Sequence, residues 1–257
     1  MFRLSKHCFL LYNTLQKGSV KMENRYASRI EKVQMSSIRV VMEKVEKLRS
    51  QGKSVVSLCA GEPDFNTPEG IKKATIEALN DNQTHYSSNR GYLGLRKKVA
   101  HLLKEQTTID YDSDTEIIMT CGCSEAINNV CQAFINKDDE VIIFTPAFVS
   151  YQNTVLLCQG IPVEIPLKLS LGFQIDIEEV KNKITKKTKM IILNNPNNPT
   201  GAVYQKETLE QLCKLARENN ILILADEIYN QLDYENQYVS IASFENMKDY
   251  TIIVNGF

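Results

Sequence analysis

The sequence predicts an α/β fold: a mostly parallel β-sheet with helices on both faces. Extended and helical patterns alternate along the second half of the chain, as they do in β-α-β units. Four extended segments are almost continuously apolar, at residues 140–144, 189–193, 221–225 and 251–255. A strand needs such a run when both of its faces are buried, and this is the usual position of a parallel strand.

The first half of the chain shows weaker signals of the same two kinds. Apolar residues at helical spacing predict helices, and short extended apolar runs predict strands. In order, the predicted elements are a helix at 38–48 followed by Gly52, a strand at 54–58, a helix starting at Thr67-Pro68-Glu69 and reaching 79, and a helix at 95–103. The hydroxyl, proline and acid of the second helix start are typical of a capped N-terminus.

From residue 116 onward the alternation is regular. Strands are predicted at 116–120, 140–144, 162–165, 189–194, 221–225 and 251–255, and helices at 125–135, 150–157, 177–184 and 206–219. In a parallel sheet with helices on both faces, ligands bind beyond the carboxyl ends of the strands. The polar motifs that follow these strands are therefore the candidate functional residues.

Composition excludes several classes of protein. The chain has 257 residues, 43% hydrophobic and 24% charged, with a net charge of −1. That length suits one α/β domain, or one domain and part of another. The basic residues are scattered, so no nucleic-acid partner is expected. No apolar run reaches 18 residues, so no membrane span is expected.

The cysteines indicate reduced thiols and no metal site. Seven cysteines without disulfide-like spacing are typical of small buried side chains in a reducing compartment. Cys121 and Cys123 form a Cys-x-Cys pair, but the three histidines make no zinc-type spacing with it. We therefore expect a cytoplasmic protein. The alternative is mitochondrial targeting by residues 1–21, which are basic and contain no acidic residue; Met22 is an alternative start.

A stiff polar turn follows the strand at 189–194. It reads Asn194-Asn195-Pro196-Asn197-Asn198-Pro199-Thr200-Gly201. Prolines, asparagines and a glycine are turn formers, so a plain loop is one interpretation. A second polar group, Ala225-Asp226-Glu227-Ile228-Tyr229, follows the next strand, and its acid is either a helix cap or a functional carboxylate.

Two further strand ends carry candidate groups. At Thr120-Cys121-Gly122-Cys123-Ser124 a glycine and a helix start predict an anion site, with an ordinary cap at Ser124 as the alternative. After the strand at 140–144 comes Phe148, either a stacking ring or a core aromatic.

Together these motifs resemble the class I aminotransferases that use pyridoxal 5′-phosphate, the aspartate and aromatic aminotransferase-like group. The resemblance covers roughly residues 30–257 and includes the NPxNPTG and D-E-x-Y signatures. It implies that Asp226 pairs with the ring nitrogen and that Asn198 and Tyr229 bond the phenolic oxygen. It also implies that Phe148 stacks on the ring and that Gly122, Cys123 and Ser124 hold the phosphate.

Two N-terminal motifs extend the resemblance. Gly61-Glu62-Pro63-Asp64-Phe65 resembles the GEPDF segment near the substrate carboxylate, which makes Gly61 a substrate-binding candidate. Tyr86, with Gly91 and Leu95-Arg96 after it, resembles a pattern whose tyrosine reaches the phosphate of the neighbouring subunit. The complete protein is therefore expected to be a homodimer that exchanges an amino group between an amino acid and a 2-oxo acid.

The chain departs from the family at its end. The family's Schiff-base lysine would lie just beyond Phe257, so no catalytic residue is present, and Lys248 does not match it. We expect residues 1–29 to be an extension, 30–60 an N-terminal arm, and 61–257 an incomplete cofactor-binding large domain without the small C-terminal domain. On this interpretation the 257-residue chain is inactive by itself.

Three alternatives stay open. The first is a C–S β-lyase or another enzyme with the same cofactor cage. The second is a non-catalytic truncated subunit. The third is a nucleotide-binding α/β protein, which would need a G-x-G-x-x-G string that the sequence lacks.

Overall fold

The sheet is entirely parallel and has five strands in the order β2-β1-β3-β4-β5. The computed structural model describes residues 27–33, 37–59, 61 and 65–257. The strands are β1 (Glu140–Thr145), β2 (Ile161–Pro166), β3 (Thr188–Asn194), β4 (Leu222–Asp226) and β5 (Thr251–Val254). They reproduce five of the predicted strands to within two residues at either end, and the predicted fold class is confirmed.

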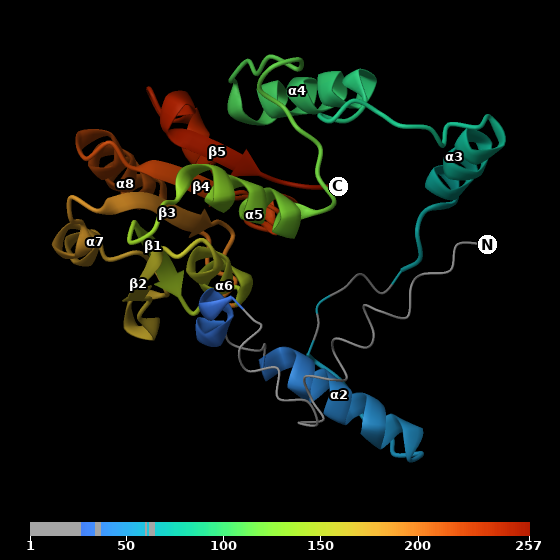
Figure 1. Ribbon diagram of the computed structural model, residues 1–257, viewed down its shortest axis with the longest axis horizontal. Coiled ribbons are helices and arrows are strands. Elements are labelled where there is room, and N and C mark those ends of the chain that lie inside the picture. The colour runs from blue at the N-terminus through green and yellow to red at the C-terminus, as the bar shows by residue number, and fades with distance from the viewer. Residues whose placement is uncertain (1–26, 34–36, 60, 62–64) are drawn as a thin grey trace.

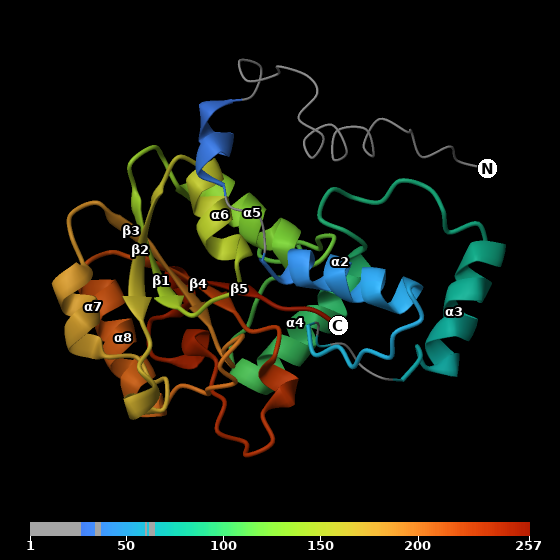
Figure 2. The ribbon, with the colours of Figure 1, turned by 90° about the horizontal axis from the view of Figure 1, so that it is seen from below.

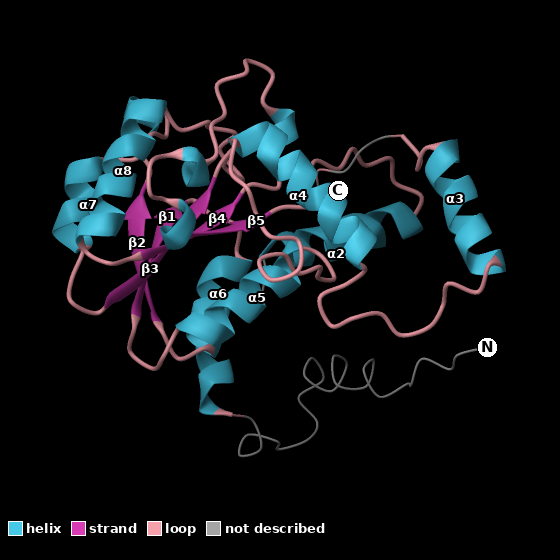
Figure 3. Ribbon diagram, turned by 90° about the horizontal axis from the view of Figure 1, so that it is seen from above, coloured by secondary structure: helices cyan, strands magenta, loops and turns pink. Residues whose placement is uncertain are grey.

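Helices cover both faces of the sheet. The α-helices are α2 (Ser37–Ser50), α3 (Glu69–Asn80), α4 (Leu93–Thr107), α5 (Cys123–Phe134), α6 (Ser150–Leu157), α7 (Ile177–Lys183) and α8 (Lys206–Glu218). Short 3₁₀ turns lie at Ser28–Lys32, Leu169–Leu171, Asn230–Leu232, Ile241–Ser243 and Lys248–Tyr250. Figures 2 and 3 show α7 and α8 on one side of the sheet and α5 and α6 on the other.

Strand side chains alternate between two apolar cores. Ile142 and Phe144 of β1 point into the core beneath α7 and α8, whereas Val141 and Ile143 point into the core beneath α5 and α6. The amphipathic helix α8 fits this arrangement, because its buried residues recur at helical spacing: Leu209, Leu212, Cys213 and Ala216. Each buried leucine contributes about 1.5–3 kcal/mol of apolar burial, so this packing fixes the sheet on which the site is built.

The N-terminal elements stand away from the sheet. Figure 1 shows α2 and α3 separated from the strands, with α4 beyond β5. The predicted helix at residue 67 does begin there, at Glu69, but without a capping bond from Thr67: the N-cap position is Pro68. Residues 1–26, 34–36, 60 and 62–64, which include the basic segment and Glu62-Pro63-Asp64, lie outside the described residues.

Two predicted strands are wrong. Residues 54–58 form no strand, and Val56 and Leu58 are 87% and 94% exposed. Residues 116–120 also form none: the amide of Met119 donates to the carbonyl of Arg90 at 3.0 Å, not to a strand. The physical reason is that a strand needs a hydrogen-bonded neighbour, and among the described residues no segment pairs with either run.

Candidate functional site

A cavity of about 520 Å³ lies at the carboxyl ends of the strands. The register pairs Asn194 with Asp226, and Asp226 with Val254, so three strands end together there. Seven of the residues predicted to bind a cofactor line this cavity, and they come from four separate segments: Gly122, Cys123, Ser124, Phe148, Asn198, Asp226 and Tyr229.

Asp226 is a buried carboxylate on the cavity wall. It is the last residue of β4 and only 4% exposed. Its Oδ2 accepts a hydrogen bond from the Tyr151 hydroxyl at 2.6 Å, and its Oδ1 accepts one from the amide of Ile228 at 3.3 Å. Burial raises the pKa of Asp226, and both donors work against that rise because they stabilise the charged form. The site therefore offers a desolvated acceptor well suited to a cationic partner.

Tyr151 was not identified from the sequence as a site residue. It is 3% exposed, and burial followed by the nearby Asp226 charge raises its pKa, so it acts as a hydrogen-bond donor. Its ring packs edge-on against Phe148, with centroids 5.6 Å apart at 80°. The available signal was the spacing of the two aromatic residues, since positions three apart share one side of a helical turn.

Asn198 and Tyr229 meet on the same wall. The Nδ2 of Asn198 donates to the hydroxyl of Tyr229 at 3.1 Å. A phenol that accepts one bond keeps its own hydrogen to donate, and the asparagine amide keeps a second N–H. This pair can therefore present two donors to one oxygen of a ligand.

The other asparagines of the turn support the backbone. The Oδ1 of Asn195 accepts from the amide of Tyr204 at 3.0 Å, and the Oδ1 of Asn197 accepts from the Thr200 hydroxyl at 2.7 Å. The side chain of Asn194 bonds to the backbone carbonyl of Asp226 and to the backbone amide of Asn198. Of the four asparagines, only Asn198 lines the cavity at the strand ends. The side chains of the other three bond within the loop or to the neighbouring strand, as the loop interpretation predicts.

The N-terminus of α5 also lines the cavity. The helix begins at Cys123, with Gly122 at the N-cap position, so the alternative of an ordinary cap at Ser124 is wrong, as is a helix start at residue 125. Gly122 has φ +82°, a conformation that glycine adopts without strain. The first-turn amides of a helix have no partner within it, and its dipole favours anions there. The wall is thus suited to a phosphate or carboxylate.

Gly61 and Tyr86 lie outside this cavity. Gly61 lines an adjoining cavity of about 1110 Å³ together with Phe148, Asn198 and Tyr229. Tyr86 is fully exposed and lines neither cavity, so within a single chain the structure does not bring it to the other candidate residues.

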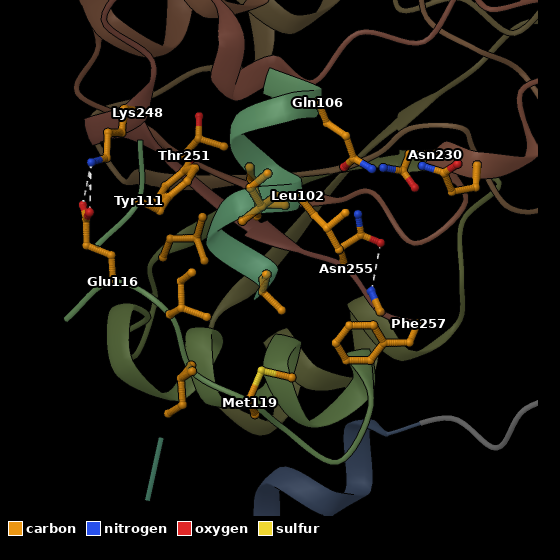
Figure 4. A pocket seen from close by; sticks show the side chains of 18 of the residues that line it. Leu102, Gln106, Tyr111, Glu116, Met119, Asn230, Lys248, Thr251, Asn255 and Phe257 are labelled. Atoms are coloured by element: carbon orange, nitrogen blue, oxygen red, sulfur yellow. Dashed lines mark hydrogen bonds and ion pairs between the residues drawn. The ribbon is translucent and has the colours of Figure 1, made fainter. Parts of the chain in front are cut away.

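A further cavity of about 390 Å³ lies between α4, residues 117–119 and β5. Figure 4 shows Lys248 pointing toward Glu116 at one end, where the two form an ion pair of 2.8 Å. None of the residues predicted for the site lines this cavity. Within the described ranges, no group of three metal-binding side chains is present, and no helix is long and apolar enough to cross a membrane.

Known proteins match the chain over most of its length. Residues 53–257 match the family described as aminotransferase class I and II. A probable aspartate/prephenate aminotransferase of Aquifex aeolicus is 37% identical, with 92% of this chain and 60% of that protein covered. An aspartate aminotransferase of Pyrococcus abyssi is 42% identical over 80% of this chain and 53% of that protein.

Solved structures agree. A Thermus thermophilus aspartate aminotransferase double mutant gives a TM-score of 0.85 at 38% identity, covering 90% of this chain and 60% of the other. A Thermotoga maritima aspartate aminotransferase gives 0.87 at 34% identity, covering 90% and 62%. The chain thus spans about 60% of the length of these structures. It belongs to the aminotransferase class I and II family.

Proposed function

We propose that this chain binds pyridoxal 5′-phosphate in the cavity at the strand ends. The carrying observation is that an anion-binding helix start, an aromatic ring, an amide–phenol pair and a buried carboxylate surround one space of about 520 Å³. These groups complement the phosphate, ring, phenolic oxygen and ring nitrogen of that ligand. The residues present therefore fit the cofactor of the resembled family.

Each wall has a defined part in this proposal. The amides of Cys123 and Ser124 hold the phosphate, with the Ser124 hydroxyl as a further donor. Phe148 covers one face of the ring. Asn198 and Tyr229 donate to the phenolic oxygen, and Asp226 holds the proton on the ring nitrogen. Bound in this way, the cofactor supplies an electron sink for reactions at the α-carbon of an amino acid.

The reaction proposed for the whole protein is transfer of an amino group between an amino acid and a 2-oxo acid. Support comes from the names of similar proteins, which are aminotransferases for aspartate, prephenate and aromatic amino acids. Gly61 lines the cavity adjoining the ring contacts, so we propose it on the substrate side. We further propose that the exposed Tyr86 reaches the phosphate bound by a second copy.

Binding is tested with 4′-deoxypyridoxine 5′-phosphate, because this probe has the phosphate, ring nitrogen and phenolic oxygen but no aldehyde to react with surface lysines. Equilibrium dialysis measures its Kd. The Asp226→Asn variant should bind about 10- to 100-fold more weakly, because a charge-assisted bond contributes about 1.5–3 kcal/mol. Asp249→Asn, at an exposed carboxylate, is the control. Equal affinity for the two variants would overturn the proposal.

A further inference from the structure

Asn194 is a buried side chain that connects two parts of the proposed site. It is the last residue of β3 and 3% exposed. Its Nδ2 donates to the backbone carbonyl of Asp226 at 3.0 Å. Its Oδ1 accepts from the backbone amide of Asn198 at 2.7 Å. One side chain therefore bonds a strand end with its donor and the following turn with its acceptor.

The two bonds also fix the amide orientation. A carbonyl can only accept and a backbone N–H can only donate, so a flipped Asn194 amide would satisfy neither partner. Asparagine is the residue that offers both functions at this length: aspartate has no donor when ionised, and glutamine is one methylene longer. Because Asn194 is buried, losing its acceptor leaves the amide of Asn198 without that partner, whereas the Asp226 carbonyl keeps the amide of Asn195 as a second donor at 3.1 Å.

Beyond Asn194, both connections lead to ligand-facing groups. Asp226 presents its carboxylate to the cavity, and the hydrogen-bonded pair Asn198 and Tyr229 also lines it. Asp226 and Asn198 belong to different segments, the end of β4 and the turn after β3. The Asn194 side chain is thus a short physical link between the acceptor and the donor pair.

We propose that Asn194 is a positioning residue that holds Asp226 and the Asn198–Tyr229 pair at the spacing required by one ring-shaped ligand. This rests on the proposed function. Asn194 itself does not line the cavity, so it acts through its two backbone partners. Replacing Asn194 changes none of the side chains proposed to contact the ligand. It should still weaken ligand binding, because part of the binding free energy would then be spent on ordering the site.

The test uses the ¹⁵N-labelled 257-residue chain and two measurements: the exchange rate of the Asn198 amide by NMR, and the Kd of 4′-deoxypyridoxine 5′-phosphate. Asn194→Ala removes both bonds. The matched control is Asn219→Ala, since the Nδ2 of Asn219 also donates to a backbone carbonyl, that of Leu215 at 2.9 Å, far from the cavity. Far-UV circular dichroism checks that each variant is folded.

Asn194→Ala should exchange the Asn198 amide about tenfold faster and bind the probe about tenfold more weakly, as expected for loss of two buried hydrogen bonds. Asn219→Ala should change neither value. If Asn194→Ala does not fold, Asn194→Asp decides: it keeps the acceptor, so the Asn198 amide should stay protected while the probe binds more weakly. A probe affinity within about twofold of wild type in the folded variant overturns the inference.

The two proposals fail in distinguishable ways. Wild-type affinity for the probe tests the proposed function, and the ratio of variant to wild type tests the role of Asn194. If the wild-type chain does not bind the probe, the proposed function fails. Faster Asn198 exchange in Asn194→Ala would then still support the positioning of Asn198, and unchanged exchange would overturn it.

Discussion

Replacing Tyr151 by phenylalanine should weaken binding of the cofactor probe and shift its pH dependence. The change removes only the hydroxyl that donates to Asp226 at 2.6 Å and keeps the ring that packs against Phe148. A buried bond from a neutral donor to a carboxylate contributes about 1.5–3 kcal/mol. The probe should therefore bind roughly 10- to 100-fold more weakly at a pH where the carboxylate of Asp226 stays ionised only because of this bond.

The sign of the pH effect follows from the charged form that Tyr151 stabilises. Burial already raises the pKa of Asp226, and the Tyr151 hydroxyl lowers it. Without that donor the pKa of Asp226 rises further, because the bond stabilises the charged form. The carboxylate is then lost at a higher pH as the solution is acidified. The acid-side midpoint of probe binding should accordingly move to a higher pH.

Equilibrium dialysis across a pH series measures both effects. The control is Tyr111→Phe, because the Tyr111 hydroxyl is buried without a hydrogen-bond partner among the described residues and lines a different cavity. That variant should keep the wild-type Kd and midpoint. If Tyr151→Phe also keeps them, Tyr151 does not support Asp226 and the electrostatic account of the site is wrong.

Three further predictions concern stability and the turn at Gly122. Burial raises the pKa of Glu227 from 4.5 to about 7, so the unfolded chain loses this proton first, and the free energy of unfolding should fall by up to about 3 kcal/mol between these pH values. Urea titrations should show a flatter profile for Glu227→Gln. Gly91→Ala should lower the free energy of unfolding by about 2 kcal/mol or more, because φ is +86° and the new Cβ would lie 2.6 Å from Met119 Cγ. The control is Gly70→Ala on α3, where the new Cβ meets open space, and it should not destabilise the fold. Gly122→Ala has φ +82° but no clash, so it should leave folding within about 1–2 kcal/mol and weaken probe binding severalfold by dialysis.

The core of the fold could be predicted because its signals are local and its partners are close in sequence. Helices that are adjacent in the sequence to the apolar runs at 140–144 and 221–225 pack on these strands and bury their side chains. Residues 116–120 carry a similar run, yet their conformation depends on a partner strand that local pattern does not supply. The same holds for residues 54–58. Pairing with another strand is a tertiary property, and it decides whether an extended run becomes a strand.

The site shows the same division. Its location follows from the rule that polar motifs after parallel strands meet at one edge, and Asp226 and Asn198 do lie there. The partner of Asp226 could not be predicted, because the Tyr151 hydroxyl reaches the carboxylate only through the packing of α6 on the sheet. The hydrogen-bond partners of the four asparagines could not be predicted from the sequence either, since they depend on which backbone amides and carbonyls the folded turn brings close.

Hydrogen bonds around the cavity explain how the carboxyl ends of the strands can carry an ordered site. Asp226 is held at its carboxylate by Tyr151 and at its carbonyl by Asn194, and Asn198 is held by Asn194 and Tyr229. These bonds leave lone pairs on the Asp226 carboxylate, one N–H on the Asn198 amide and the hydroxyl hydrogen of Tyr229 free for a ligand. A ligand then meets groups whose ordering cost is already met by folding, so its binding energy is not spent on arranging them. Variants at Tyr151 and Asn194 should consequently weaken ligand binding by disturbing Asp226 and Asn198, whereas variants at Asp226 remove a proposed contact outright.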